Sequence, residues 1–344
     1  MTVARRRLTR FMATAALGLG AVLAGPSPAA ADPAGPTDYR TEVIEIIPPA
    51  AAVAVEIAGG DSFVGLHVNE GTTVEVVGYR GEPYLRFGPD GTVERNDRSP
   101  SRWLNEDRYG DGVLPETVDP DIEPEWVTVA DDGTFFWHDH RAHWMNPSQP
   151  LGASSGDVVL EAVVPLIVDG QDVDVHVSSV LLAPPSIVPV VIGVAAAAVL
   201  VLGAVLVGAG PGLMALVAAW AGLAMAVGLM AFRSMPAATG PSLLLWAPAG
   251  VAVAAAAGAL FAHLRLRSAS LAGALMAMAG GELVWWAWLR RDALDHAFIP
   301  TDVPFWLDRL LVAGAFVVGA AIVVSALWGV IRAAGPPRRS PEAS

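Results

Sequence analysis

Five apolar segments in the second half of the chain constrain its fold more than any other feature. They cover roughly residues 187–208, 212–232, 243–263, 269–289 and 307–331. A membrane-spanning helix needs about 20 mainly apolar residues to cross about 30 Å of hydrocarbon. Because the connections between the segments are short, we expect residues 187–333 to form an all-α transmembrane bundle of five antiparallel helices.

The first 31 residues have the order of a secretory signal peptide. Basic residues at positions 5–10 precede an apolar stretch at 11–25, and small residues at 29–31 precede Asp32. The arginine run also resembles a twin-arginine signal loosely, so both export routes stay open. Export places residues 32–186 outside the cell membrane. The C-terminal tail, residues 334–344, is then cytoplasmic, and the arginines at 265 and 267 obey the positive-inside rule.

Residues 32–186 are acidic and have the pattern of short β-strands. They carry 28 acidic side chains and 8 arginines, which argues against nucleic acid as a partner. Apolar residues alternate with polar ones, and turn formers such as Gly59-Gly60-Asp61 and Pro89-Asp90-Gly91 separate the runs. The pattern predicts an antiparallel, all-β sandwich. We expect residues 94–125, which are polar and acidic, to be a solvated loop.

A histidine-rich motif, FFWHDHRAHWM at residues 135–145, is the main candidate for chemistry. If the strand runs to His140, His138 and His140 share one face about 7 Å apart. A turn near Arg141 then folds His143 back towards them. Neutral imidazoles suit copper, zinc or nickel, and the Met145 thioether suits Cu(I). His67 and His176, both in predicted strands, complete the site if the topology brings them close.

Two other interpretations of this motif remain open. In a structural latch, Asp139 pairs with Arg141 and the histidines bond to backbone carbonyls. In a proton switch, the histidines respond to pH, since imidazole titrates near neutrality. The chain has no cysteine, which excludes disulfides and thiolate metal sites. It also has no GxSxG or HExxH motif, so we expect it not to be an enzyme.

The membrane half contains two further candidates. Glu282 lies inside the fourth apolar segment, where a carboxylate is costly and marks a site by default. Its alternative role is a single protonated or hydrogen-bonded carboxyl that ties two helices together, or a side chain that reaches the membrane interface. Transport would rest on this residue alone. The loop of residues 290–309, which contains His296, contributes a ligand or forms a docking surface beneath the outer domain, and we expect the docking surface.

The segment GTFFWHDH at residues 133–140 resembles the Gly-Thr-aromatic-Trp-His-x-His strand of cupredoxin-type multicopper oxidases. The segment GTTVEVV at residues 71–77 also looks like a cupredoxin strand. The whole layout resembles exported actinobacterial multi-pass membrane proteins, and periplasmic copper-resistance proteins fused to membrane domains. The resemblance implies a cupredoxin-like or Ig-like sandwich over residues 32–186. The sequence departs from the oxidases in having no cysteine and no second histidine-rich motif.

These observations together predict a non-enzymatic envelope membrane protein. The leading hypothesis is that it binds or hands on a transition metal, copper first, through His138, His140, His143 and Met145. The alternative is a membrane-anchored interaction or scaffold module that holds no metal and engages an envelope protein partner. In both cases the lipid bilayer surrounds the helices.

Overall fold

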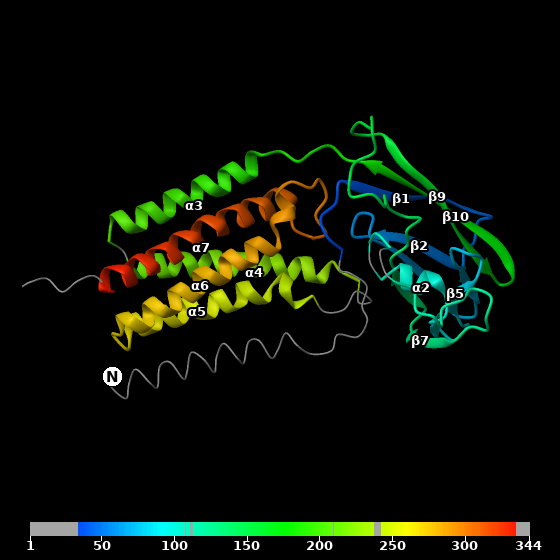
Figure 1. Ribbon diagram of the computed structural model, residues 1–344, viewed down its shortest axis with the longest axis horizontal. Coiled ribbons are helices and arrows are strands. Elements are labelled where there is room, and N and C mark those ends of the chain that lie inside the picture. The colour runs from blue at the N-terminus through cyan, green and yellow to red at the C-terminus, as the bar shows by residue number, and fades with distance from the viewer. Residues whose placement is uncertain (1–33, 107, 111–112, 209, 237–241, 335–344) are drawn as a thin grey trace, which may run out of the picture. The chain divides into compact units, whose positions relative to one another are not determined.

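The computed structural model describes residues 34–106, 108–110, 113–208, 210–236 and 242–334 (Figure 1). The predicted signal peptide at residues 1–31 lies outside the described residues, as do the last ten residues of the predicted tail. The described chain comprises strands β1 to β10 followed by helices α3 to α7.

Two antiparallel sheets form the N-terminal part, as the alternating pattern predicts. The three-stranded sheet has the order β2 (Val53–Ala58), β3 (Phe63–Val68), β8 (Thr134–Trp137). The seven-stranded sheet has the order β1 (Tyr39–Ile47), β10 (Gln171–Leu181), β9 (Val158–Val168), β4 (Val74–Val77), β5 (Pro83–Phe87), β6 (Val93–Asn96), β7 (Trp126–Ala130). We call these strands and their connections the β-sandwich domain.

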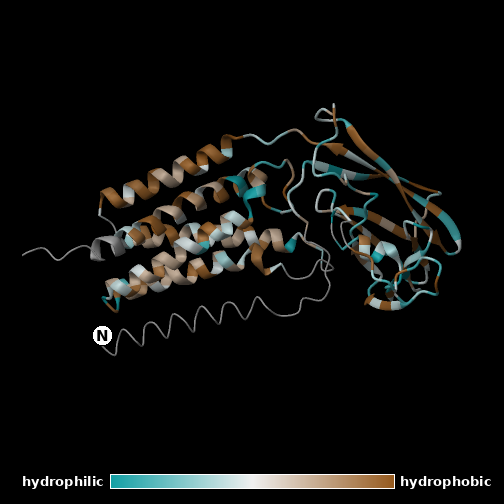
Figure 2. Cartoon of the chain, in the orientation of Figure 1, coloured by the Kyte–Doolittle hydropathy of each residue, from teal (hydrophilic) through white to brown (hydrophobic). Residues whose placement is uncertain are grey.

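The core of this domain consists of the inward-facing residues of both sheets. Leu66 of β3 is completely buried, as are Val76 of β4 and Leu85 of β5. Trp137, the last residue of β8, packs in the same cluster. Side chains alternate across a strand, so a period of two in the sequence becomes one buried face and one exposed face. Figure 2 shows this alternation as brown and teal bands along the strands.

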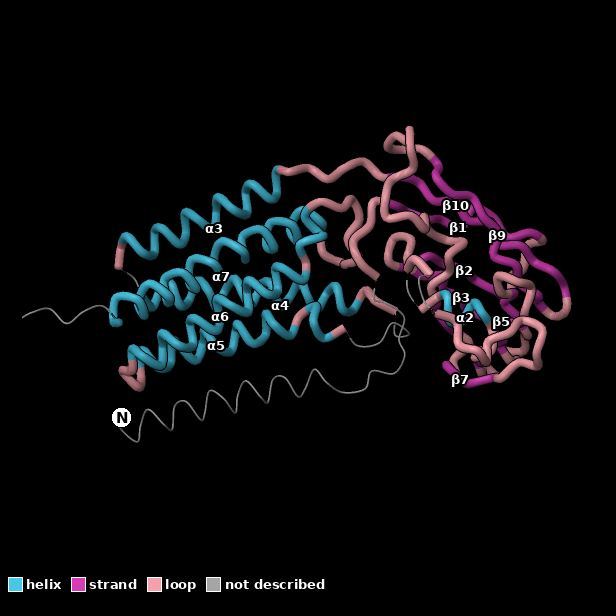
Figure 3. The backbone as a smooth tube through the Cα atoms, viewed as in Figure 1, coloured by secondary structure: helices cyan, strands magenta, loops and turns pink. Residues whose placement is uncertain are grey.

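The prediction that residues 94–125 form a solvated loop is wrong for the first part of the segment. Strand β6 occupies its start, and a short helix, α2 (Pro100–Leu104), follows with Ser99 as its N-cap. Glu82 is buried and accepts hydrogen bonds from the hydroxyls of Ser99 and Ser101. This part is held by buried polar contacts, which produce no hydrophobic period in the sequence. The described residues between 105 and 125 form turns and loops, as predicted (Figure 3).

The C-terminal part is helical, with bounds close to the predicted ones. The helices are α3 (Val188–Leu206), α4 (Gly210–Arg233), α5 (Ala247–Leu264), α6 (Ala269–Leu289) and α7 (Phe305–Ala334), with short 3-10 turns η2 (Leu243–Leu245) and η3 (Arg291–Leu294). These helices consist mainly of apolar residues, which are brown in Figure 2. Within α3 only Gly193 and Ala197 are buried, and α3 packs mainly on α7.

The number of spans differs from the prediction. Four helices in the described chain, rather than five, are long and apolar enough to cross a membrane: α3, α4, α5 and α7. The exception is α6, in which Glu282, serine, glycines and three tryptophans lower the hydropathy. This helix still packs against both α5 and α7, and the Trp286 indole donates a hydrogen bond to the carbonyl of Leu245.

The connection between α6 and α7 has ordered contacts at both of its ends. Arg290 and Asp308, both buried, form an ion pair, and the Arg309 guanidinium donates to the carbonyl of Ala293. In the middle, Phe298 and Thr37 exchange two backbone hydrogen bonds of 2.8 and 3.1 Å. The predicted docking role of this loop is thus supported by direct pairing with the segment that precedes β1.

Candidate functional site

The histidine-rich segment begins where β8 ends. The strand stops at Trp137, so the prediction of a strand to His140 is wrong. A turn follows instead, in which the amide of Ala142 donates to the carbonyl of Asp139 over 2.8 Å. The Thr41 hydroxyl of β1 donates to the carbonyl of Ala142 and fixes the turn against the seven-stranded sheet. The predicted reversal near Arg141 is therefore confirmed, and it starts directly after the strand.

This turn gathers the three predicted histidines. The ring centres of His140 and His143 lie 5.4 Å apart, and those of His138 and His143 lie 6.4 Å apart. Both pairs meet edge to face. His143 is fully buried and His138 nearly so, while His140 is half-buried. His143 thus occupies the centre of the group, which we call the histidine cluster.

Backbone carbonyls define the tautomers of two of these rings. Nδ1 of His138 lies 2.6 Å from the carbonyl oxygen of Ser62, and Nε2 of His143 lies 2.6 Å from that of Arg108. A carbonyl only accepts, so each of these nitrogens carries the proton. Nδ1 of His143 therefore presents a lone pair. It is buried and has no hydrogen-bond partner among the described residues.

Electrostatics keep His143 neutral. Burial, together with the nearby Arg108, His140 and His138, lowers the pKa of His143 to about 3, although its hydrogen bond to the Arg108 carbonyl opposes this shift. A neutral imidazole is the form that binds metals. The proton-switch interpretation loses support at this residue, because a pKa so low leaves its charge unchanged between pH 5 and 8.

The metal-free protein should lose stability in acid through His143. The unfolded residue titrates near pH 6.5, so the contribution of neutral His143 is complete above that pH and declines as the pH falls towards 3. We expect the slope to approach about 1.4 kcal/mol per pH unit between pH 6 and 4.5. The difference between the unfolding midpoints of the wild type and of His143→Gln, recorded at each pH with a chelator present, measures this contribution to stability. Parallel curves for the two proteins contradict a neutral His143.

Asp139 and Arg141 form the ion pair that the latch interpretation predicts. The guanidinium of Arg141 binds both carboxylate oxygens of fully buried Asp139, at 2.8 and 2.7 Å. The Trp137 indole donates to the same carboxylate over 2.9 Å. Burial alone raises the pKa of Asp139, but Arg141 and Trp137 outweigh it and leave the pKa below its usual value. Arg141 is thus neutralised by Asp139 instead of opposing a cation in the cluster.

Aromatic rings border the cluster on two sides. Phe63 of β3 stacks on His138 with ring centres 4.2 Å apart, and Tyr79 stacks on His140 at 5.7 Å. The Tyr79 hydroxyl also accepts a hydrogen bond of 2.7 Å from the amide of His140. Gly110 packs against the His140 ring and the methyl end of Met145, where a side chain would collide with His140. Met145 therefore lies beside the cluster, as predicted.

The other two histidines predicted for the site lie elsewhere. His67 on β3 contacts Glu56 and Thr134 at the domain surface. His176 of β10 lies opposite Glu45 of β1 and Val163 of β9. Within the described parts of the chain, no group of three or more His, Asp or Glu side chains is arranged to hold a metal ion. The three rings are close, but they do not converge on one point.

Sequence reasoning missed the residues that orient the cluster. Ser62 and Arg108 supply the two carbonyls, and buried Asp61 forms an ion pair of 2.5 Å with Arg108. Asp61 follows two glycines, and this pattern gives no reason to expect more of it than formation of a turn. Arg108 lies in the segment assigned to a solvated loop. The segment holds three other arginines, Arg95, Arg98 and Arg102, so nothing in the sequence marks Arg108 out.

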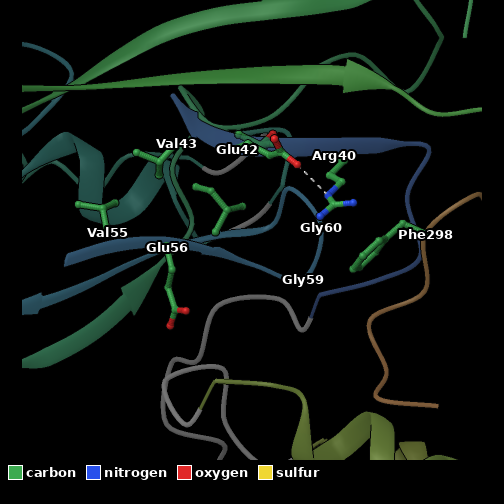
Figure 4. A pocket seen from close by; sticks show the side chains of 10 residues that line it. Arg40, Glu42, Val43, Val55, Glu56, Gly59, Gly60 and Phe298 are labelled. Carbon is green, nitrogen blue, oxygen red and sulfur yellow. Dashed lines mark ion pairs between the residues drawn. The ribbon is translucent and has the colours of Figure 1, made fainter. Parts of the chain in front are cut away.

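A separate groove lies between β1 and β2, each of which is an edge strand of its sheet. It has a volume of about 320 Å³ and is lined by apolar and charged side chains, among them Val43, Val55, Arg40 and Glu42. Figure 4 shows the Arg40–Glu42 ion pair on its rim and Phe298 at one end. None of the clustered histidines lines it.

Glu282 remains a second polar candidate, on α6. Its Oε2 atom is buried and has no hydrogen-bond partner in the described part of the chain. The tie between helices that the sequence suggested is therefore not formed by this oxygen. Helix α6 carries one acidic residue and no basic residue, whereas a transport path typically has several polar groups.

Comparisons with known proteins give no functional assignment, so a proposal has to be argued from the site. No protein-family model matches the chain, and no match is found among curated proteins or solved structures.

Proposed function

We propose that this is a non-enzymatic, multi-pass membrane protein whose β-sandwich domain binds a transition metal at the histidine cluster. The observation that carries the proposal is the buried, unpartnered Nδ1 of His143 between two further imidazole rings. A buried polar atom without a partner is rare in folded proteins and requires an explanation, such as an ion or a water molecule. His138, His140 and His143 would hold the metal.

The carbonyl contacts support this proposal. Histidines that ligate metals usually donate their other ring N–H to a carbonyl or carboxylate, which fixes the tautomer and the ring orientation. His143 has this arrangement, with Arg108 as the acceptor, and the Ser62 carbonyl orients His138. The rings are not yet converged, so binding has to draw them together. Half-buried His140, beyond the end of β8, is the most exposed of the three rings.

Copper is the first candidate among the metals. Imidazole serves copper, zinc and nickel, and the thioether of Met145 beside His140 favours Cu(I) among them. A metal-binding sandwich of cupredoxin-like or Ig-like type, exported by the N-terminal signal, then lies outside the cell membrane. If α6 crosses the bilayer with the four more apolar helices, the C-terminus lies in the cytoplasm. Handing a metal on is then the task of this domain.

Metal titration of the full-length protein in detergent tests the proposal. We expect one equivalent of Cu(I) or Zn(II) to bind to the wild type and no binding to the triple variant His138→Ala/His140→Ala/His143→Ala. The matched control is His67→Ala/His176→Ala/His296→Ala, which removes three histidines outside the cluster and should bind normally. A folded wild-type protein that binds neither metal would falsify the proposal.

The second candidate is an interaction module in which the histidines are structural. It is favoured by the groove between the edge strands β1 and β2, since an extended peptide can add to an exposed strand edge. The Asp139–Arg141 pair then acts as a latch without metal. This function predicts that the triple histidine variant is less stable than the wild type whether or not metal is added.

A further inference from the structure

Asp61 is buried in the turn between β2 and β3 and takes no part in the cluster directly. Its exposed fraction is 0%, and both side-chain hydrogen bonds that it accepts run through one oxygen. Oδ2 accepts a hydrogen bond of 2.5 Å from Nη2 of Arg108 and one of 3.3 Å from the Thr37 hydroxyl, whereas Oδ1 has no partner among the described residues. Burial raises the pKa of Asp61, and the Arg108 guanidinium opposes that rise.

The backbone connects Asp61 to both carbonyls that orient the cluster. The next residue, Ser62, supplies the carbonyl bonded to Nδ1 of His138. The ion-pair partner, Arg108, supplies the carbonyl bonded to Nε2 of His143. One carboxylate therefore holds two chain segments that are 47 positions apart in the sequence, and each segment fixes one ring.

These two rings carry their protons on different nitrogens. His138 is protonated on Nδ1 and His143 on Nε2, since each of those atoms faces a carbonyl. An unconstrained neutral imidazole exchanges between the two tautomers. The two rings therefore keep these different tautomers only if the carbonyls of Ser62 and Arg108 stay in position beside them.

We infer that Asp61 is a positioning residue: through its ion pair with Arg108 and its link to Ser62, it sets the tautomers and orientations of His138 and His143. The consequence for metal binding rests on the proposed function, but the tautomers themselves do not. Removing an outer partner of a metal-binding histidine typically lowers metal affinity about 10- to 100-fold.

The experiment uses the full-length protein in detergent with 15N-labelled histidine. In metal-free wild type, two-bond 15N–1H spectra should show His138 as the Nδ1–H tautomer and His143 as the Nε2–H tautomer. In Asp61→Asn we expect His143 to show a mixture of tautomers and metal affinity to fall about 10- to 100-fold. Asp131→Asn makes the same charge change in the exposed turn before β8 and should change neither readout.

Two further variants keep the test decisive if Asp61→Asn does not fold. Arg108→Lys retains the charge but not the guanidinium fork, and we expect a partial loss of the His143 tautomer. Arg108→Met removes the partner of the carboxylate, and the effects of Asp61→Asn and Arg108→Met should not add in the double variant, because both changes break the same pair.

Wild-type tautomers in folded Asp61→Asn or Arg108→Lys overturn this inference. If the wild type binds no metal, the proposed function fails, while the tautomer spectra still decide the role of Asp61. If the wild type binds metal and the tautomers of the variants are unchanged, only the inference fails.

Discussion

Replacing Arg141 with methionine should lower the free energy of unfolding by about 3–5 kcal/mol, the usual cost of removing one partner from a buried ion pair. Asp139 is fully buried, and Arg141 contacts both of its oxygens. Without Arg141 the carboxylate stays in the core with only the hydrogen bonds of Trp137 and nearby groups to stabilise its charge. Denaturant unfolding of the full-length protein in detergent, followed by tryptophan fluorescence, measures the change.

Two variants separate the ion pair from general effects of losing an arginine. Arg80→Met removes an exposed arginine in the turn between β4 and β5 and should alter the free energy of unfolding by less than about 0.5 kcal/mol. Asp139→Asn/Arg141→Met removes both charges and should recover part of the loss, since no uncompensated charge remains. Equal stability of Arg141→Met and Arg80→Met would show that the pair does not hold the turn together.

The second large effect concerns the packing of α6 on α7. Gly280 is buried at this contact, where an added Cβ would lie 2.8 Å from Ile322 and 2.9 Å from the carbonyl oxygen of Gly319. A leucine at this position has no space and must push the helices apart. Overpacking costs typically 1–3 kcal/mol, and we expect Gly280→Leu to reach the upper end, about 3 kcal/mol, because one neighbour is backbone.

The adjacent glycine provides the matched control. Gly281 is exposed, and an added Cβ there meets nothing within 4 Å. Gly281→Leu makes the same change in composition and helix propensity, one residue further along α6, and should leave the bundle intact. Thermal unfolding in detergent compares the two variants. Similar melting temperatures would mean that α6 does not pack on α7 through Gly280.

The two variants also help to interpret metal binding. Gly280→Leu disturbs the bundle, whereas Arg141→Met disturbs the turn that carries the histidines. If the cluster binds metal, we expect Arg141→Met to weaken binding and Gly280→Leu, which changes the bundle alone, to leave it unchanged. Metal titrations of both variants then distinguish a loss of the site from a loss of the whole fold.

The large helices and strands, and which of the two each segment forms, follow from local patterns in the amino-acid sequence. Apolar runs of about 20 residues become helices wherever they occur, because their backbone hydrogen bonds close within the segment. The positions of α3, α4, α5 and α7 followed from this rule. Alternating apolar and polar residues, with turn formers between the runs, likewise indicated an antiparallel β-sandwich, because successive side chains of a strand point to opposite faces.

The surroundings of the histidines, in contrast, depend on contacts between distant parts of the chain. The sequence placed His138, His140 and His143 near one another because they are close along the chain. It did not show that β8 ends at Trp137, or that Asp61 and Arg108, far apart in sequence, orient the rings. Contacts of this kind depend on how two sheets and a loop meet in space. Buried ion pairs and hydrogen bonds produce no repeating pattern along the sequence. Local patterns therefore predict helices and strands, but they do not predict which polar residues pair across the fold.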